Sequence, residues 1–503
     1  MTILRYDGKI GFDCNYYTNL QSSEIIKRAS RFKKLYLEFG GKLMYDYHAA
    51  RVLPGYEINA KMKTVKKLAK LKNIEFLLCV NADYIEKEEK LGSLNMTYND
   101  FTLKMISEIR NLGFKINTCV INFFNKQKKA IAFSQLMKEK GMNVYFMNYI
   151  DGYPKNIKAI TSEKGFAKKP FIKTNADIVI VTGAGPNSGK MATCLAMIYQ
   201  DYLKGIDSGY AKFETFPVWN ISINSPINIA YEAATADIGD YNVIDPYHLK
   251  AYGIKAVNYN RDVETFGLLK ILIKRLISKD NFMHNYKSPT DMGINTIKDA
   301  ITDIRLCEKA AKQEIIRRAF RYYVDFLKGS SSYEAYKRAK EIINKHKLSI
   351  KKERPIVYEA RKIAKGSHVG CALYINGKII SAKDGKNMHA EASVLIKALK
   401  YIANIKEEEH VLWQNAIERV KELRSIVYKD KDPHLTIKEM LILLSISSEK
   451  NKKAKKMMAM LNNLNGAEMH TTHMLSNEEE SILLKLGINA TSDGRAMIKR
   501  VVF

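Results

Sequence analysis

The sequence lacks the features that mark several special classes of protein. No apolar run approaches the roughly 20 residues that a membrane-spanning helix needs, and the first residues contain no hydrophobic signal-peptide core. Only six cysteines occur in 503 residues, and none forms a C-x-x-C pair. These absences argue against a membrane span, a disulfide framework and a structural zinc site. We therefore expect a cytoplasmic protein whose cysteines are small core residues.

Motifs of nucleic-acid-binding proteins and of peptidases are also missing. The formal net charge is +29, but the lysines are dispersed along helix faces, and no RRM, KH or helix-turn-helix signature occurs. Neither H-E-x-x-H nor G-x-S-x-G is present. The positive charge suits a polyanionic small molecule as well as nucleic acid. We expect a phosphorylated small molecule as the partner, and neither nucleic acid nor a membrane.

Short apolar runs alternate with helical stripes through residues 1–165. One such stripe is Phe101, Met105, Ile109 and Leu112, which ends at Gly113. Repeated βα units predict a parallel sheet covered by helices. The four predicted strands of this part are 35–39, 74–80, 116–122 and 144–148.

Residues 176–204 predict a strand, a glycine-rich turn and a helix. The β-branched run 178–181 suits a buried strand, and apolar residues recur at helical spacing after Lys190. The first turn of a helix has unpaired N–H groups and a partial positive charge, which favour an anion. Ser188 and Lys190 would add a hydroxyl and a charge. The alternative is that the glycines only make a tight turn.

This stretch departs from a regular P-loop. The motif G-x-x-x-x-G-K-[ST] would need glycine at 184 and a hydroxyl at 191, where the chain has Ala184 and Met191. Thr193 lies roughly 200° further around the helix, so it does not replace the hydroxyl directly. A bound metal ion would therefore need carboxylates from elsewhere in the chain.

A second set of polar residues follows the first predicted strand. Lys42, His48 and Arg51 lie just beyond residues 35–39, and ligands of open α/β sheets bind beyond the carboxyl ends of strands. These residues are candidates for anion binding or acid/base chemistry. The alternative is a turn followed by a surface helix.

Acidic residues after the glycine-rich turn are candidate metal or base partners. Glu214 falls in the alternating run 210–216, and Asp245 follows a short predicted strand, 243–244. Turn chemistry explains Asp245-Pro246 equally well. The polar loops 258–262 and 287–291 could complete a pocket or simply cap helices.

The last third of the chain, residues 331–503, has its own pattern. After the linker 329–332, a hairpin over 369–382 turns at Asn376-Gly377. His389-Ala390-Glu391 then opens an apolar helix, an order that resembles the front half of the cytidine deaminase fold. No cysteine follows Cys371, so the zinc-binding P-C-x-x-C is missing. We expect a degenerate deaminase-like module, inactive as a deaminase, that serves structure or oligomerisation.

Several segments of the chain together indicate a family resemblance: 37–42, 46–55, 185–195, 210–217, 231–237 and 288–293. They resemble a bacterial family catalogued as domain of unknown function eighteen forty-six. The resemblance covers nearly the whole chain but implies little chemistry, because the family has no established activity. The label ATP-dependent peptidase, which some members carry, has no support in these residues.

The sequence thus predicts an α/β protein with a P-loop-like strand-loop-helix and a C-terminal α+β domain. We expect domains at 1–165, 166–330 and 331–503, and a homo-oligomer. The expected function is binding of ATP, another nucleotide or a phosphorylated small molecule in a phosphate-dependent reaction, with Mg²⁺ left open and no zinc. The alternative is a non-catalytic regulatory oligomer that senses a phosphorylated metabolite, and a less favoured one is a protein that binds nucleic acid through its basic surface. Expected phosphate-binding residues are Gly185, Asn187, Ser188, Gly189, Lys190, Lys42 and Arg51, and expected catalytic residues are Lys190, Glu214, Asp245 and His48.

Overall fold

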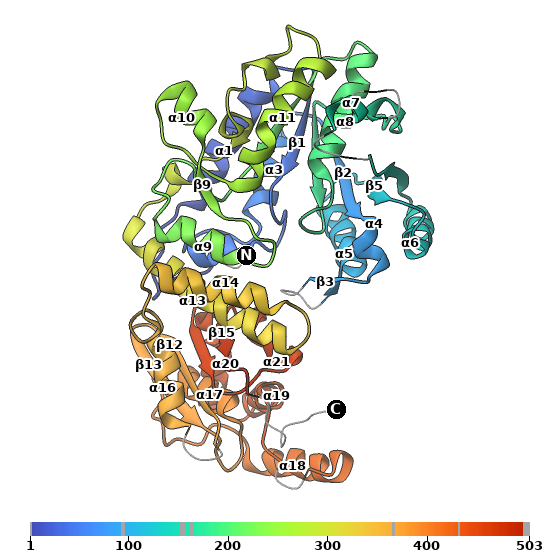
Figure 1. Cartoon of the computed structure of the whole chain (residues 1–503). Coiled ribbons are helices and arrows are strands. Elements are labelled where there is room, and N and C mark those ends of the chain that lie inside the picture. The colour runs from blue at the N-terminus through green and yellow to red at the C-terminus, as the bar shows by residue number, and fades with distance from the viewer. Residues whose placement is uncertain are drawn as a thin grey trace.

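The chain folds around two hydrophobic cores, which the computed structural model describes for residues 3–91, 96–150, 152, 156–160, 162, 165–364, 368–430 and 433–495. One core draws its residues from positions 4–343 and the other from positions 369–488. In Figure 1 the larger unit lies above and the smaller one below, with α13 (Ile304–Leu327) and α14 (Tyr333–Lys345) between them.

The larger unit contains one seven-stranded sheet in the order β11-β8-β1-β7-β2-β5-β6, in which every pairing is parallel. This confirms the predicted parallel sheet. Strand β7 lies between β1 and β2, so residues 1–165 and 166–330 contribute to the same sheet. The strands are β1 (Lys34–Phe39), β2 (Ile74–Asn81), β5 (Thr118–Phe124), β6 (Asn143–Asn148), β7 (Ile178–Gly183), β8 (Ser208–Phe213) and β11 (Gly293–Ile294).

The helices of this unit follow the apolar stripes of the sequence. In α5 (Tyr98–Asn111), Thr97 caps the start, and Phe101, Met105 and Ile109 of the predicted stripe are buried. Leu112, the fourth predicted residue, follows the helix as its C-cap and is exposed. Helix α1 packs on α3, and α11 packs on α8. The remaining helices before α13 are α1 (Cys14–Ala29), α2 (Tyr47–Val52), α3 (Ala60–Leu68), α4 (Ala82–Glu86), α6 (Lys128–Glu139), α7 (Ile157–Ile160), α8 (Lys190–Leu203), α9 (Pro226–Ala234), α10 (Pro246–Tyr252), α11 (Asn260–Leu276) and α12 (Pro289–Met292).

Two short antiparallel ribbons stand outside the central sheet. Strand β9 (Asn242–Ile244) pairs with β10 (Val257–Tyr259), and β3 (Lys90–Leu91) pairs with β4 (Met96–Thr97). The short strand predicted before Asp245 therefore exists, but it does not belong to the parallel sheet. Asp245 consequently lies outside the row of carboxyl ends at which ligands of α/β sheets collect.

The smaller unit is built on a mixed four-stranded sheet in the order β13-β12-β14-β15. Only β14 and β15 run parallel. Asn376 and Gly377 both have positive φ, +48° and +77°, as the predicted hairpin requires. The strands are β12 (Gly370–Ile375), β13 (Lys378–Lys383), β14 (Glu468–Thr471) and β15 (Asn489–Ser492), and the helices are α15 (Ile350–Glu353), α16 (Pro355–Ile363), α17 (Ala390–Ile402), α18 (Gln414–Tyr428), α19 (Ile437–Ser447), α20 (Lys452–Ala459) and α21 (Asn477–Lys485).

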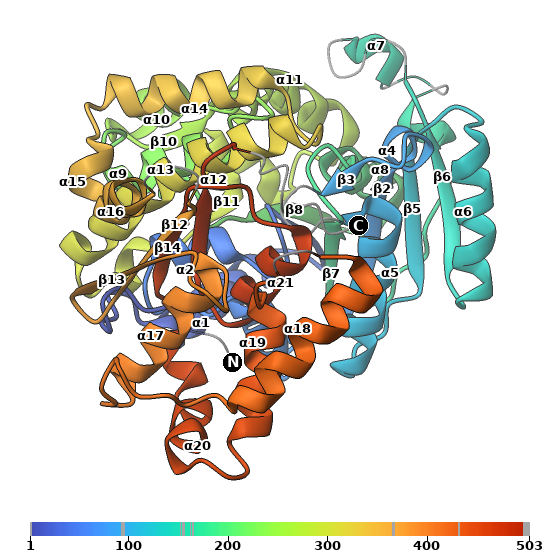
Figure 2. The same ribbon diagram turned by 90° about the horizontal axis from the view of Figure 1, so that it is seen from below.

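Buried polar contacts join the two units. Helix α13 packs against α2, α9 and α14 on one side and against β15 on the other. Arg317 of α13 and Arg354 both bind the Glu468 carboxylate of β14, and Arg354 is fully buried. Figure 2, a view from below, shows the red strands and helices of the smaller unit against the blue and yellow elements of the larger one. In the described part of the chain, no helix is long and apolar enough to cross a membrane.

Candidate functional site

The glycine-rich loop between β7 and α8 is held by side chains from the two strands beyond it. Asn81 at the end of β2 donates from Nδ2 to the carbonyl of Asn187 at 2.9 Å. Asn122 of β5 donates from Nδ2 to the carbonyl of Ser188 at 2.8 Å. The Thr193 hydroxyl donates to Asn122 Oδ1 at 3.2 Å. These contacts fix the loop at the carboxyl edge of the sheet.

Two of the loop's glycines are required by packing. A Cβ at Gly189, whose φ is +79°, would lie 2.6 Å from Cγ of Asn122. At Gly185 a Cβ would lie 2.5 Å from the ring of Tyr98. The space that glycine leaves at 185 is therefore filled by Tyr98. Packing against Tyr98 is therefore sufficient to require glycine at 185, whether or not the loop binds an anion.

The start of α8 nevertheless keeps donors for an anion. Within the described residues, the backbone N–H groups of Gly189, Lys190 and Met191 have no hydrogen-bond acceptor. Lys190 Nζ donates to Ser188 Oγ at 3.4 Å and is half-buried. Unpaired amides, an ammonium group and the helix dipole together can hold a phosphate.

A buried cluster of charged groups lies two strands away at the same edge. Lys212 of β8 is in register with Glu38 of β1, and both side chains are buried. Lys212 Nζ lies 2.5 Å from Asp262 Oδ2 and 3.4 Å from Glu214 Oε1. It also donates to the Tyr259 hydroxyl. One lysine therefore holds two buried carboxylates.

Burial shifts the pKa values of this cluster in opposite directions. Burial raises the pKa of Glu214 to about 7, since Asp262 adds repulsion and Lys212 only partly offsets both. Burial by itself lowers the pKa of Lys212, but Asp262, Tyr259 and Glu214 outweigh it and raise that pKa well above its ordinary value. Glu214 can thus take up or release a proton near neutral pH, as a general acid or base does.

Arg261 connects the loop to this cluster. Its Nη1 donates to Asn187 Oδ1 at 2.8 Å. Its Nε lies 2.6 Å from Asp240 Oδ1, and its Nη2 donates to Asp240 Oδ2 at 2.7 Å. The next residue, Asp262, is the partner of Lys212. The first turn of α11 therefore contacts the glycine-rich loop and the buried cluster at once.

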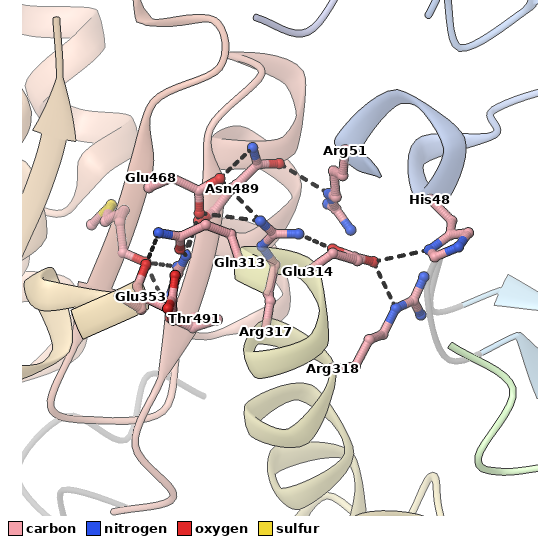
Figure 3. Close-up of polar contacts among 12 residues, drawn as sticks. His48, Arg51, Gln313, Glu314, Arg317, Arg318, Glu353, Glu468, Asn489 and Thr491 are labelled. Carbon is pink, nitrogen blue, oxygen red and sulfur yellow. Dashed lines mark hydrogen bonds and ion pairs between the residues drawn. The ribbon is translucent and has the colours of Figure 1, made fainter. Parts of the chain in front are cut away.

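The structure places the other predicted anion-binding set on a different surface. His48 Nδ1 lies 3.3 Å from Glu314 Oε1 of α13, and Arg51 Nε donates to Asn489 Oδ1 of β15 at 2.9 Å. Figure 3 shows these groups around the Glu314 carboxylate, at the junction of the two units. The surface helix that was the alternative for this segment exists as α2, but its polar side chains face α13 and β15.

Asp245 has the contacts of a helix cap. It is fully buried, and its Oδ1 accepts from the N–H groups of Tyr247 and His248 at 2.9 and 3.0 Å. Its Oδ2 accepts from the Thr290 hydroxyl at 2.7 Å. Both oxygens are therefore occupied. The geometry favours the turn-chemistry alternative over a metal or base role.

The His-Ala-Glu segment of the smaller unit forms a buried polar group. Glu391 is fully buried, lies 3.0 Å from His473 Nδ1 and accepts from the Thr471 hydroxyl. His389 Nδ1 lies 3.8 Å from Asp384. Within the described ranges, no three His, Cys, Asp or Glu side chains are arranged to hold a metal ion.

Sequence reasoning missed several residues of these groups. Lys212 and Glu38 carried a signal, because each is a charged residue inside an otherwise apolar strand. Asp262 and Arg261 were visible only as part of a polar loop. Glu314 and Arg318 gave no signal, since charged residues on a long helix usually face solvent.

Comparisons with known proteins give one consistent result. The family described as "Domain of unknown function DUF1846, N-terminal" matches residues 10–347, and its C-terminal counterpart matches residues 352–500. A UPF0371 protein of Clostridium tetani is 40% identical over 496 residues, which cover 96% of this chain and 97% of that protein. UPF0371 proteins of Fusobacterium nucleatum and Streptococcus uberis are each 40% identical, over 500 and 487 residues, with the same coverage.

Proposed function

The chain belongs to the bacterial family of domain of unknown function DUF1846, and we propose that it binds a phosphorylated small molecule at the carboxyl edge of its parallel sheet. In this proposal the amides at the start of α8 and Lys190 hold the phosphoryl group. Glu214 exchanges a proton with the bound molecule. Nucleotides and phosphosugars are the ligand classes that we would screen first.

The observation that carries the proposal is the hydrogen bond that Arg261 donates to Asn187. Strands β7, β1 and β8 are neighbours and run parallel, so their carboxyl ends lie in a row. Arg261 spans this row from the cluster to the loop at 2.8 Å. Asp262, the residue after Arg261, binds Lys212, which in turn lies 3.4 Å from Glu214, so a chain of contacts links the anion donors to a carboxyl group with a pKa of about 7.

The chemistry follows from charge and protonation. Donors fixed by the protein stabilise negative charge on a phosphoryl group without reorganising, which lowers the barrier to its reaction. Glu214, protonated in about half of the molecules near pH 7, can give or accept the accompanying proton. Met191 occupies the place of the usual magnesium-binding hydroxyl, and Asp262 is bound to Lys212. These residues do not fit a metal in its usual position, and no step is assigned to one.

The test combines ligand binding with turnover. Thermal unfolding with each nucleotide or phosphosugar should show stabilisation in the wild type that is lost in Lys190→Ala. The control, Lys173→Gln, removes an exposed lysine and should keep the stabilisation. Glu214→Gln should bind the ligand but lose turnover. Stabilisation that is equal in wild type and Lys190→Ala would reject the site.

A regulatory oligomer is the second candidate, favoured by the exposed apolar face of α18. Leu423, Ile426 and Val427 are 57%, 61% and 58% exposed. On this helix Glu418 and Glu422 balance Arg419 and Lys421, and Arg424 is paired with Asp430 and Glu439. Two copies can therefore approach there despite the net charge of +29. The proposed occupant is α18 of a second copy.

Light scattering after gel filtration tests this assembly. Val427→Glu should convert a dimer into a monomer, because it places a charge in the apolar face. Lys452→Glu, an exposed charge change in the same unit, should leave the dimer intact. A wild-type protein that is monomeric at all concentrations rejects this candidate.

A further inference from the structure

At the junction between the two units, several arginines share two buried carboxylates. Glu314 is shared by Arg317 and Arg318, and Glu468 is shared by Arg317 and Arg354. Arg51 donates from Nε to the neutral amide of Asn489, and its guanidinium lies over the Tyr47 ring. Four arginines, Arg51, Arg317, Arg318 and Arg354, thus lie around two carboxylates, Glu314 and Glu468. Lys42 lies near Arg51 and Arg318, with Asp46 and Asp237 as its acidic neighbours.

Two of these arginines have terminal nitrogens available for a ligand. Arg318 uses its Nε for Glu314, at 2.7 Å, and Arg51 uses its Nε for Asn489, at 2.9 Å. Within the described residues, the Nη atoms of these two arginines donate no hydrogen bond to the protein. In Figure 3 both guanidinium groups lie beside the Glu314 carboxylate, with His48 next to Arg318.

His48 adds an acceptor to the same place. Its Nδ1 faces the Glu314 carboxylate at 3.3 Å, so Nδ1 carries the proton of the neutral ring. Its Nε2 is buried and has no hydrogen-bond partner among the described residues. That nitrogen can accept a hydrogen bond from a hydroxyl or from a protonated phosphate oxygen.

The electrostatics favour an anion at this place. Burial, Arg318 and Arg51 together lower the pKa of Lys42 to about 8, although Asp46 and Asp237 partly offset them. Burial and Arg318 likewise lower the pKa of Arg51 to about 10. Cations that repel each other in a desolvated place are stabilised when an anion binds among them. Arg51, Arg318 and Lys42 are all partly accessible, so a small anion can reach them.

We propose that Arg51 and Arg318, with Lys42 and His48 beside them, bind a phosphoryl group at the junction of the two units. The planar forks of two arginines suit a tetrahedral oxyanion with two negative charges better than a single carboxylate. This site goes beyond the function proposed above, because it uses none of the residues of the glycine-rich loop. It joins α2 of the larger unit to α13, and through Arg51 to β15 of the smaller one.

Thermal unfolding in inorganic phosphate tests the site, with Lys190→Gln as the background that removes the loop's ammonium group. Phosphate should raise the Tm of Lys190→Gln by about 2 °C or more. The gain should vanish when Arg51→Gln or Arg318→Gln is added. It should persist with Arg305→Gln, an exposed arginine at the start of α13. Acetate at equal ionic strength should give no gain.

The results separate the two sites. If phosphate stabilises the wild type but not Lys190→Gln, the junction site is rejected and the loop site stands. If Lys190→Gln gains as much as the wild type, the junction site stands and the loop site fails. An equal gain with and without Arg51 and Arg318, or with acetate, also rejects the junction site. In phosphate-free buffer Arg51→Gln should not lower the Tm, whereas a purely structural arginine would.

Discussion

Arg261 donates from Nη1 to Oδ1 of Asn187 at 2.8 Å, although 74 residues separate them in the chain. This contact ties the first turn of α11 to the glycine-rich loop. Asp240 holds the guanidinium from the other side at 2.6 and 2.7 Å. The arginine is thereby oriented for Asn187, so the loop's position depends on α11 as well as on the strands beneath it.

Removing this contact should weaken phosphate binding without unfolding the protein. We expect Arg261→Gln to lower affinity for a phosphorylated ligand by about tenfold, the effect of losing one charge-assisted hydrogen bond. Arg275→Gln, an exposed arginine on the same helix, is the matched control. Isothermal titration calorimetry measures both. Equal affinities in the two variants would mean that Arg261 does not position the loop.

Glu214 should make stability depend on pH in an identifiable window. Its pKa is about 7 in the folded protein and 4.5 in its ordinary state, so the folded form holds the proton more tightly. The protonated Glu214 carboxyl therefore stabilises the folded protein fully below pH 4.5, and this stabilisation is lost as the pH rises to about 7. In the wild type this loss lowers the free energy of unfolding by up to about 1.4 kcal/mol for each pH unit in the window. Glu214→Gln carries no titrating group at this position and should not show the loss.

Urea unfolding at several pH values measures this difference. The stability of Glu214→Gln relative to wild type should rise from pH 4.5 to 7 and then become constant. Glu449→Gln, an exposed carboxyl in the smaller unit, should show no such rise. A flat difference for Glu214→Gln would contradict the raised pKa.

Lys212 should be essential for stability because it neutralises two buried carboxylates. Lys212→Met leaves Asp262 and Glu214 without their shared cation, which should cost about 3–5 kcal/mol. The double variant Lys212→Met/Asp262→Leu should recover part of this loss, since an apolar pair of similar volume replaces the ion pair. Denaturant unfolding of the wild type, the two single variants and the double variant measures the coupling free energy between Lys212 and Asp262. Additive losses would show that the two side chains act independently.

Local patterns predicted much of the fold. The strand at 178–183 and the stripe of α5 follow from apolar periodicity, and the hairpin at 376–377 follows from Asn-Gly turn chemistry. These signals depend only on residues close together in sequence. For the same reason they located the glycine-rich loop and the helix after it.

The strand order and the buried ion pairs were not predictable in this way. Glu38 and Lys212 become neighbours only because β8 lies beside β1, which no local pattern specifies. Likewise Glu314 sits on a helix whose charged residues suggest a solvated face, yet it is buried by packing against both units. Asp245 shows the opposite case, where a carboxylate after a strand proved to be a cap.

The most direct measurement of the central claim is a crystal structure of the protein grown with inorganic phosphate. We predict a phosphate bound by the N–H groups of Gly189, Lys190 and Met191 and by Lys190 Nζ, with Arg261 still donating to Asn187. An ordered loop that has no phosphate at these amides, at a concentration that stabilises the protein, would contradict it.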